Sequence, residues 1–344
     1  MCSTPWLTVL IAVRFGENGE ALLRKTLHSL SVADGLRAES QVLVVDNHDA
    51  PNEKLQALLT EFAFLNLDYL HVPTPGLGRA QNQGVARVTT PWIAFLDADE
   101  TVPAHWLTAY KQTLKDKGWH PDTVLFGPCS PKLPHRPTWL SPNLEWLFGG
   151  HSQSGENLAK SASRPLRQMF GGNMLINRHV LVENQGISEV LPRGMDTDLA
   201  WRLECQNKYE GLFVPAAFIY HHITPSRLTL AYLKRLQYTM SYFKTLLLLH
   251  HFYPEPSLRA RLSLSRSHLR RWLLKIKHSW TQPALTFHQR HAETQVWAQG
   301  IKGGLHMLLW GYRTWIPRLR SEGLPRCTEI QRQRSHGGDN QVGP

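Results

Sequence analysis

The chain has 344 residues, 42% of them hydrophobic, and a formal net charge of +11. This is ample material for a sizeable core, and the composition is ordinary for a soluble globular protein of one or two domains. The N-terminus lacks the basic lead-in of a signal peptide, and the longest late apolar run, residues 246–249, is too short to cross a bilayer, so we expect a cytoplasmic protein. Four widely separated cysteines form no C-x-x-C pair, which predicts reduced thiols and argues against a structural zinc site.

The charge is divided unevenly along the chain. Residues 1–225 carry a net charge of −3, whereas residues 226–344 carry +14. We therefore predict an α/β domain at residues 1–225, a basic amphipathic helical region at 226–325 and a disordered tail at 326–344. A strongly basic region favours an anionic partner, either a nucleic acid or a phospholipid surface.

Strand and helix patterns alternate in the N-terminal part of the chain. Apolar runs and helical spacing predict, in order, strand 7–13, helix 20–30, strand 41–45, helix 51–64, strand 69–72, helix 76–88, strand 92–96, helix 103–117 and strand 123–126. This alternation is typical of a mainly parallel sheet flanked by helices. In such sheets, ligands bind beyond the carboxyl ends of the strands.

The later segments follow a different pattern. We predict a long loop with short helical pieces at 127–165, a strand at 169–176, a helix beginning near residue 194 and a last apolar segment at 211–221. Beyond residue 225 we predict an amphipathic helix at 233–247, a helix at 258–276 in which leucines alternate with cations, and a weaker helix at 292–309 that glycines interrupt.

The strongest chemical signal is the acidic segment after the strand at 92–96. Asp97, Asp99 and Glu100 lie within four positions, and carboxylates so close together repel one another unless a cation lies between them. A divalent ion with oxygen ligands fits this pattern, and such an ion commonly binds a diphosphate. The alternative is a solvated acidic turn. Asp46 also follows a predicted strand, which suggests that the acids share one cleft.

Several separated motifs resemble those of the family 2 glycosyltransferases, enzymes with a nucleotide-binding α/β domain of the GT-A type. The resemblance covers about residues 7–243. It rests on residues 44–47 after the second strand, the glycine-rich helix start at 75–84, the D-x-D element at 95–99, the segment 171–178, the G-x-D-x-D-L pattern at 194–199 and the segment 215–221. It implies transfer of a sugar from a nucleotide-diphosphate donor to a hydroxyl acceptor with inversion at the anomeric carbon, in the assembly of a cell-surface polysaccharide or a glycolipid.

The resemblance also implies roles for individual residues. The expected general base is Asp196. The expected nucleotide contacts are Asp46, Gly76, Arg79, Asn82 and Asp97. The expected ligands of Mg²⁺ or Mn²⁺ are Asp97, Asp99 and His221.

Some of these residues also have a purely structural interpretation. Asp196 or Asp198 can cap the helix that follows, because Asp is a preferred N-cap residue and suits the helix dipole. Asp46 can be a strand-end turn residue, and Gly76 can do no more than shape the turn that begins at Pro75.

Two other functions stay open for the whole chain. Gln81 stands where the family has an arginine, Met195 stands where an acidic residue is common, and the first strand lacks its usual ending. These departures suggest a degenerate domain that binds nucleotide without turnover. The net charge suggests a non-enzymatic nucleic-acid-binding protein, but no zinc-finger spacing or aromatic RNA-binding signature accompanies it, so we expect no nucleic-acid partner.

The helix at 258–276 predicts contact with a membrane. Trp272 and the leucines alternate with seven cations at positions 259–277, a composition typical of a helix lying in the plane of an anionic membrane. We therefore expect peripheral association with the inner face of the cell membrane, where the enzyme would meet a saccharide or a lipid-linked acceptor. The alternative is a solvated helical face.

Overall fold

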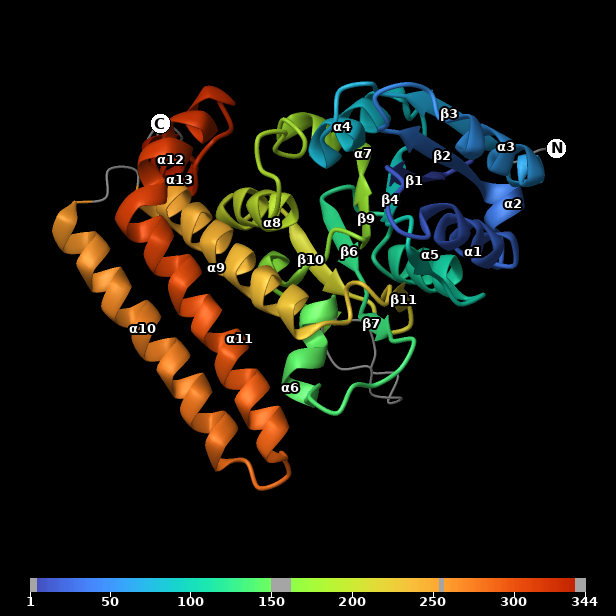
Figure 1. Cartoon of the computed structure of the whole chain (residues 1–344). Coiled ribbons are helices and arrows are strands. Elements are labelled where there is room, and N and C mark those ends of the chain that lie inside the picture. The colour runs from blue at the N-terminus through green and yellow to red at the C-terminus, as the bar shows by residue number, and fades with distance from the viewer. Residues whose placement is uncertain (1–4, 150–161, 254–256, 338–344) are drawn as a thin grey trace, which may run out of the picture. The chain divides into compact units, whose positions relative to one another are not determined.

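The computed structural model describes residues 5–149, 162–253 and 257–337 and divides into two compact units (Figure 1). The sheet unit is formed by Met1–Lys132 and Gly149–His222, and the helical unit by Leu133–Phe148 and Ile223–Pro344. We expected residues 133–148 to be a loop of the α/β domain. Their buried apolar side chains, among them Leu140 and Leu144, belong instead to the core of the helical unit.

The sheet unit contains an eight-stranded sheet with the order β3-β2-β1-β4-β9-β6-β10-β8. The strands are β1 (Leu7–Val13), β2 (Ser40–Asp46), β3 (Leu67–His71), β4 (Trp92–Leu96), β6 (Thr123–Phe126), β8 (Ala162–Ser163), β9 (Asn173–Asn177) and β10 (Glu210–Phe213). Strands β3, β2, β1 and β4 are parallel, as are β6 and β10, whereas β9 is antiparallel to both of its neighbours. The predicted mixed, mainly parallel sheet is confirmed.

Helices cover both faces of this sheet because its central strands are apolar on both sides. Along β1, Val9 and Ile11 pack into one core cluster and Leu10 into the other. The first cluster includes side chains of α1 (Gly19–Ser31), α2 (Leu36–Glu39), α3 (Glu53–Glu61) and α5 (Trp106–Asp116). The second includes side chains of α4 (Leu77–Arg87), α7 (Arg178–Glu183) and α8 (Met195–Cys205).

The parallel strands deliver their acidic residues to one edge of the sheet. Asp46 is the last residue of β2, and Asp97 follows Leu96 at the end of β4. A small sheet of β5 (Glu100–Thr101), β11 (Ile219–His222) and β7 (Cys129–Lys132) continues from this edge. Its pairing places His221 opposite Glu100.

The helical unit consists mainly of long helices. They are α9 (Leu230–Phe252), α10 (Leu258–Thr281), α11 (Phe287–His306), α12 (Tyr312–Ser321) and α13 (Cys327–Gly337), with the short α6 (Pro142–Glu145) and a π-helical turn at Met307–Gly311. Helices α9 and α10 both pack against α11 (Figure 1). The expected interruption of α11 by glycines is wrong: a Cβ atom on Gly303 would lie 2.1 Å from the carbonyl oxygen of Tyr238, so glycine permits the close approach of α9.

Part of the expected disordered tail is a helix. Residues Cys327–Gly337 form α13, in which Cys327 and Ile330 are buried. Glu329 accepts a hydrogen bond from the backbone N–H of Arg326 (3.0 Å), which supports the first turn. Residues 338–344 of the predicted tail lie outside the described residues.

Two observations concern the expected compartment. In the described ranges, no helix is both long enough and apolar enough to span a membrane. Cys129 is a free, buried thiol, but Cys205 and Cys327 are each disulfide-bonded. The prediction of reduced thiols is therefore wrong for these two residues.

Candidate active site

A tight turn after β4 gathers three acidic residues. The backbone N–H of Glu100 donates to the carbonyl oxygen of Asp97 (3.2 Å), and the Glu100 carboxylate accepts from the backbone N–H of Asp97 (2.9 Å). Asp99 lies inside this turn, and its carbonyl oxygen accepts a hydrogen bond from the backbone N–H of His222 (2.9 Å). The acidic segment is therefore fixed by backbone pairing rather than left as a solvated loop.

Glu100 is completely buried in this cluster. Burial, followed by the charges of Asp97 and Asp99, raises the pKa of its carboxyl group well above the usual range. Its Oε1 atom has no hydrogen-bond partner among the described residues. Glu100 belongs to the predicted acidic segment but had no predicted role, because its pairing with the distant β11 cannot be inferred from the local motif.

The small sheet brings His221 to the same acidic residues. Its Nε2 atom lies 3.4 Å from Oδ2 of Asp99. The adjacent His222 has its Nε2 atom 3.0 Å from Oγ1 of Thr101, and burial lowers its pKa to about 4. Of these two histidines, His221 has its ring beside an acidic side chain of the cluster.

The backbone of Gly171 and Gly172 connects this cluster to Asp196. A Cβ atom on Gly172 would lie 2.6 and 2.7 Å from the two carboxylate oxygens of Glu100 and 3.0 Å from Oδ2 of Asp97. The backbone N–H of Gly171 donates to Oδ2 of Asp196 (3.3 Å). Asp97, Glu100 and Asp196 therefore lie around the same two glycines, although they come from separate parts of the sequence.

The two acidic residues at the start of α8 have different environments. The N-cap position is occupied by Gly194, and Asp196 accepts a hydrogen bond from the backbone N–H of Thr197 (2.8 Å) while remaining partly exposed. Asp198 is buried and pairs with the buried Arg202 (2.9 Å). The capping interpretation of Asp198 is therefore wrong, because its carboxylate neutralises a guanidinium inside the core.

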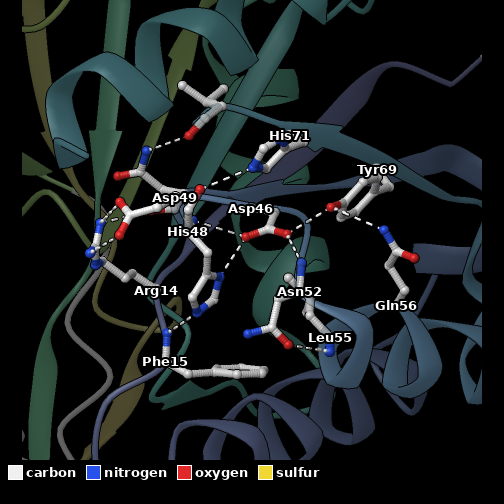
Figure 2. A network of polar contacts seen from close by, with 12 residues as sticks. Arg14, Phe15, Asp46, His48, Asp49, Asn52, Leu55, Gln56, Tyr69 and His71 are labelled. Carbon is white, nitrogen blue, oxygen red and sulfur yellow. Dashed lines mark hydrogen bonds and ion pairs between the residues drawn. The ribbon is translucent and has the colours of Figure 1, made fainter. Parts of the chain in front are cut away.

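Asp46 lies at the end of β2 in a dense polar network (Figure 2). One carboxylate oxygen accepts from the backbone N–H of His48 (3.0 Å) and contacts its ring, and the other accepts from the backbone N–H of Asn52 (2.9 Å) and the hydroxyl of Tyr69 (2.7 Å). Burial raises the pKa of Asp46, but these hydrogen bonds outweigh it and lower the pKa overall. The carboxylate thus orders the turn between β2 and α3.

Gly76 and Asn47 form a second connection at this edge. Gly76 has a φ of 150°, a conformation that favours glycine, and its N–H donates to Oδ1 of Asn47 (2.8 Å). The side-chain amide of Asn47 donates to the carbonyl oxygens of Val72 and Thr74 (both 2.9 Å). Gly76 is therefore needed to shape the start of α4, and Asn47 is a positioning residue to which the sequence analysis gave no separate role.

Arg79 and Asn82 hold the loop before α8. Arg79 pairs with Glu189 (2.9 Å), and Asn82 donates to the carbonyl oxygen of Ile187 (2.8 Å) and to Glu189 (3.1 Å). The hydrogen bonds from both donors lower the pKa of Glu189 against the opposing effect of burial. Both predicted nucleotide contacts are therefore engaged with this loop.

The predicted metal ligands form only part of a coordination shell. Asp99 and His221 are close to one another, and Asp97 lies beside Glu100 in the same turn. In the described part of the chain, however, no group of three or more His, Cys, Asp or Glu side chains is arranged to hold a metal ion by itself. A cation here would need further ligands, such as diphosphate oxygens or water.

Comparison with known sequences identifies the N-terminal half of the sheet unit. Residues 9–119 match the model of glycosyl transferase family 2. The chain is 27% identical over 223 residues to the succinoglycan biosynthesis protein ExoM of Rhizobium meliloti, an alignment that covers 62% of this chain and 67% of that protein. It is 26% identical over 211 residues to a pre-mycofactocin glycosyltransferase of Mycobacterium tuberculosis, covering 57% of this chain and 38% of that protein.

Solved structures share the fold at low sequence identity. A mannosyltransferase of Pyrobaculum calidifontis, solved with GDP-Man and Mn²⁺, has a TM-score of 0.56 at 16% identity and covers 89% of this chain and 88% of its own. S. aureus TarS, solved with UDP-GlcNAc, has a TM-score of 0.52 at 14% identity and covers 96% of this chain and 92% of its own. The protein is a glycosyltransferase with a GT-A type fold, and its residues 9–119 are similar to glycosyl transferase family 2.

Proposed function

We propose that the protein is an inverting glycosyltransferase that moves a sugar from a nucleotide-diphosphate donor to a hydroxyl group. The observation that carries this proposal is the arrangement of Asp97, Glu100 and Asp196 around Gly171 and Gly172, at the carboxyl edge of a parallel sheet. In a direct displacement, the bond from the acceptor oxygen to the anomeric carbon forms as the bond to the diphosphate oxygen breaks. The hydroxyl proton must pass to a base, and the leaving diphosphate must be stabilised.

Asp196 is the proposed base. Its carboxylate is partly exposed and is oriented by the N–H groups of Gly171 and Thr197. This leaves lone pairs on the carboxylate that can accept a proton from an incoming hydroxyl group. Asp198 is unsuited to this role because it is buried against Arg202. One base facing one leaving group is the arrangement that inversion requires.

Asp97, Asp99 and His221 are the proposed ligands of Mg²⁺ or Mn²⁺. Asp97 and Asp99 are crowded next to the Oε1 atom of Glu100, which has no hydrogen-bond partner among the described residues. A cation fits here because it would offset the negative charge that the cluster gathers. Two carboxylates and an imidazole suit these ions. A bound cation would offset the charge that develops on the leaving diphosphate. The Mn²⁺ and GDP-Man in the P. calidifontis structure support a nucleotide-sugar donor and a metal, without identifying the ligands in this chain.

The nucleotide end of the donor is proposed to lie along Asp46, Gly76, Arg79, Asn82 and Asp97. Both oxygens of the Asp46 carboxylate already accept hydrogen bonds from within the protein, which limits direct contact with a nucleotide (Figure 2). We infer that Asp46 acts by holding the β2–α3 turn. For Arg79 to reach a phosphate, its ion pair with Glu189 must open.

A thermal-shift panel tests the donor assignment. The full chain is melted with UDP, GDP, dTDP and CDP, each with and without Mn²⁺. A bound nucleotide raises the melting temperature by mass action, so one base should stand out and its effect should depend on Mn²⁺. No stabilisation by any nucleotide contradicts the proposal. Stabilisation without sugar transfer or hydrolysis would favour the degenerate domain suggested by Gln81 and Met195.

The acceptor is proposed to be a saccharide or a lipid-linked saccharide in the assembly of a cell-surface polysaccharide or glycolipid. The support is the sequence similarity to the succinoglycan biosynthesis protein of R. meliloti. Radiolabelled transfer from the preferred donor into a lipid-extractable fraction of host membranes would test it. Label found only as free sugar would contradict an acceptor of this class.

Helix α10 supports a membrane-facing role. Its leucines repeat along one face and are solvent-exposed, by 62% at Leu258, 48% at Leu262, 39% at Leu269 and 52% at Leu273. The next face carries exposed cations, at Arg259, Arg266, Arg270 and Lys277. Exposed leucines beside cations fit a helix lying on an anionic bilayer, because the apolar side chains enter the headgroup region and the cations attract anionic lipids.

We place this association at the inner face of the cell membrane, where nucleotide sugars would be at hand. The disulfide bonding of Cys205 and Cys327 is the observation that opposes a reducing compartment. Protease added to intact spheroplasts distinguishes the two sides. A protein that survives this treatment and is released from membranes by salt supports the inner face, whereas degradation contradicts it.

A further inference from the structure

The helical unit contains a cavity formed by residues outside the candidate active site. Its volume is about 380 Å³, within the range of about 300–1,000 Å³ for small-molecule sites. The walls come from α6 and the turn after it, α10 and α11, and α10 and α11 run side by side (Figure 1). The residues that matter for its chemistry are Asn143, Trp146, Lys275, His278, Glu293 and Trp297.

Glu293 lines this cavity with a carboxylate that lacks one hydrogen-bond donor within the described part of the chain. The side chain is completely buried, and its Oε1 atom accepts from the hydroxyl group of Ser141. Its Oε2 atom has no partner among the described residues. A buried acceptor without a donor destabilises the protein, so a ligand carrying O–H or N–H groups would gain free energy by donating to it.

Lys275 adds a cationic side chain to the lining of the same cavity. Its Nζ atom lies 4.7 Å from the ring centres of Trp272 and Trp297 and 5.5 Å from that of Trp146. Because the cavity has one acidic group and one lysine, a strongly charged ligand of either sign would meet a like charge. A neutral ligand with several hydroxyl groups avoids this penalty.

The tryptophans that line the cavity, Trp146 and Trp297, favour a ligand with an apolar face. Trp146 lines the cavity and is 38% exposed, whereas Trp297 is buried and its Nε1–H donates to Ser279 (3.2 Å). A flat, partly exposed indole ring packs against a ligand surface made of C–H groups. A pyranose ring combines such a surface with hydroxyl donors at its rim.

We propose that this cavity binds a neutral sugar residue, with hydroxyl groups donating to Oε2 of Glu293 and one ring face packed on Trp146. The site lies within the helical unit and uses none of the acidic residues near the sheet. The binding itself does not depend on catalysis. Its assignment to a sugar of the acceptor chain, other than the one that reacts, rests on the proposed function.

Titration of the full chain with cellotetraose, maltotetraose and chitotetraose tests the proposal without donor or metal. Intrinsic tryptophan fluorescence and calorimetry should report saturable binding of at least one of them at millimolar concentration. Trp146→Ala should weaken that binding by about tenfold, the equivalent of about 1.4 kcal/mol. Glu293→Gln, which keeps the size but replaces Oε2 with a donor, should weaken it at least as much.

Two control variants separate this site from others. Trp310→Ala removes an indole that is 63% exposed in the same unit but does not line the cavity, and Asp99→Ala removes a proposed metal ligand. Both should bind the oligosaccharide as the natural protein does. The proposal is overturned by no saturable binding of any of the three probes, by equal binding in both cavity variants, or by loss of binding in Asp99→Ala. Because transfer is assayed separately, failure here leaves the proposed enzymatic function standing, and the reverse also holds.

Discussion

The acidic cluster of the sheet unit and the cavity of the helical unit bury the same functional group in opposite surroundings. Glu100 is completely buried beside Asp97 and Asp99, and the charges of these neighbours help to raise its pKa. Glu293 is equally buried, but its cavity also contains Lys275. A region that gathers one sign of charge is suited to a partner of the opposite sign, whereas a balanced region is suited to a neutral ligand. The two regions should therefore respond differently to metal, nucleotide and sugar.

The largest effect is expected when the charge of the acidic cluster is reduced. Asp99→Ala removes a proposed metal ligand, so kcat/KM for transfer should fall about 10⁴-fold, the equivalent of about 5 kcal/mol. The Mn²⁺-dependent part of the nucleotide thermal shift should disappear with it. Asp116→Ala removes an exposed carboxylate from α5 and serves as the matched control. An Asp99→Ala enzyme that retains metal-dependent transfer would mean that the cluster does not bind the cation.

The next largest effect is expected for Asp196, where a substitution can remove proton transfer while leaving nucleotide binding in place. Asp196→Asn keeps the shape of the side chain, but its amide cannot take a proton at neutral pH. Its single oxygen can accept from only one of Gly171 and Thr197, which donate to different oxygens of Asp196. We expect kcat to fall by about 10²–10⁴-fold, with nucleotide binding unchanged in the thermal-shift assay. Transfer at the natural rate would exclude Asp196 as the base and leave only the electrostatic part of the site.

A third effect concerns the exposed face of α10 rather than its cavity face. Replacing Arg259, Arg266 and Arg270 with Gln should weaken binding to vesicles containing phosphatidylglycerol by about 10²-fold, since each cation near an anionic surface contributes about 1 kcal/mol. The control replaces Arg313, Arg318 and Arg320, which are exposed on α12 and change the net charge equally. Equal loss in both variants, measured by vesicle flotation, would show a general charge effect instead of a membrane-facing helix.

A smaller effect tests whether Asp46 is structural. Asp46→Asn should lower the melting temperature by several degrees, because hydrogen bonds to a charged group contribute about 1.5–3 kcal/mol. The pKa of Asp46 is lowered in the folded protein, so its contribution is complete above the ordinary Asp pKa and is lost as the pH falls through the folded value. The difference between the two proteins should therefore shrink on acidification. A difference that is constant with pH would contradict this origin.

The sheet unit could be predicted from sequence because its signals are local. The strand at β4 ends directly at Asp97, and the parallel register of β1 and β2 carries Asp46 to the same edge. Motif order led to the predictions of Asp196 and His221, which stay predictions. It could not reveal the position of Glu100, because β5 and β11 pair through residues about 120 positions apart. The capping interpretation of Asp198 is wrong because its carboxylate pairs with the buried Arg202.

The helical unit was harder to predict because helix packing has no comparable local signal. The glycines of α11 suggested an interruption, yet Gly303 provides the close contact with α9. The cavity combines Trp146 from one segment with Lys275 and Glu293 from two others. Since no motif links these positions, only the packed structure brings their chemistry together.

The smallest effect compares the two buried glutamates directly. In the absence of divalent metal, Glu100→Gln removes a carboxyl group whose ionisation is opposed by burial and by Asp97 and Asp99, and it places an amide donor near them. It should therefore raise the melting temperature by about 2–4 °C, the shift expected for about 1 kcal/mol in a domain of this size. Mn²⁺ should reduce this gain, because a cation would already offset the repulsion. Glu293→Gln is the matched control: its cavity has Lys275 and no second carboxylate among the lining residues, so the same substitution should bring no gain. Equal stabilisation by both substitutions would mean that burial alone, rather than the charge of the neighbours, distinguishes these sites.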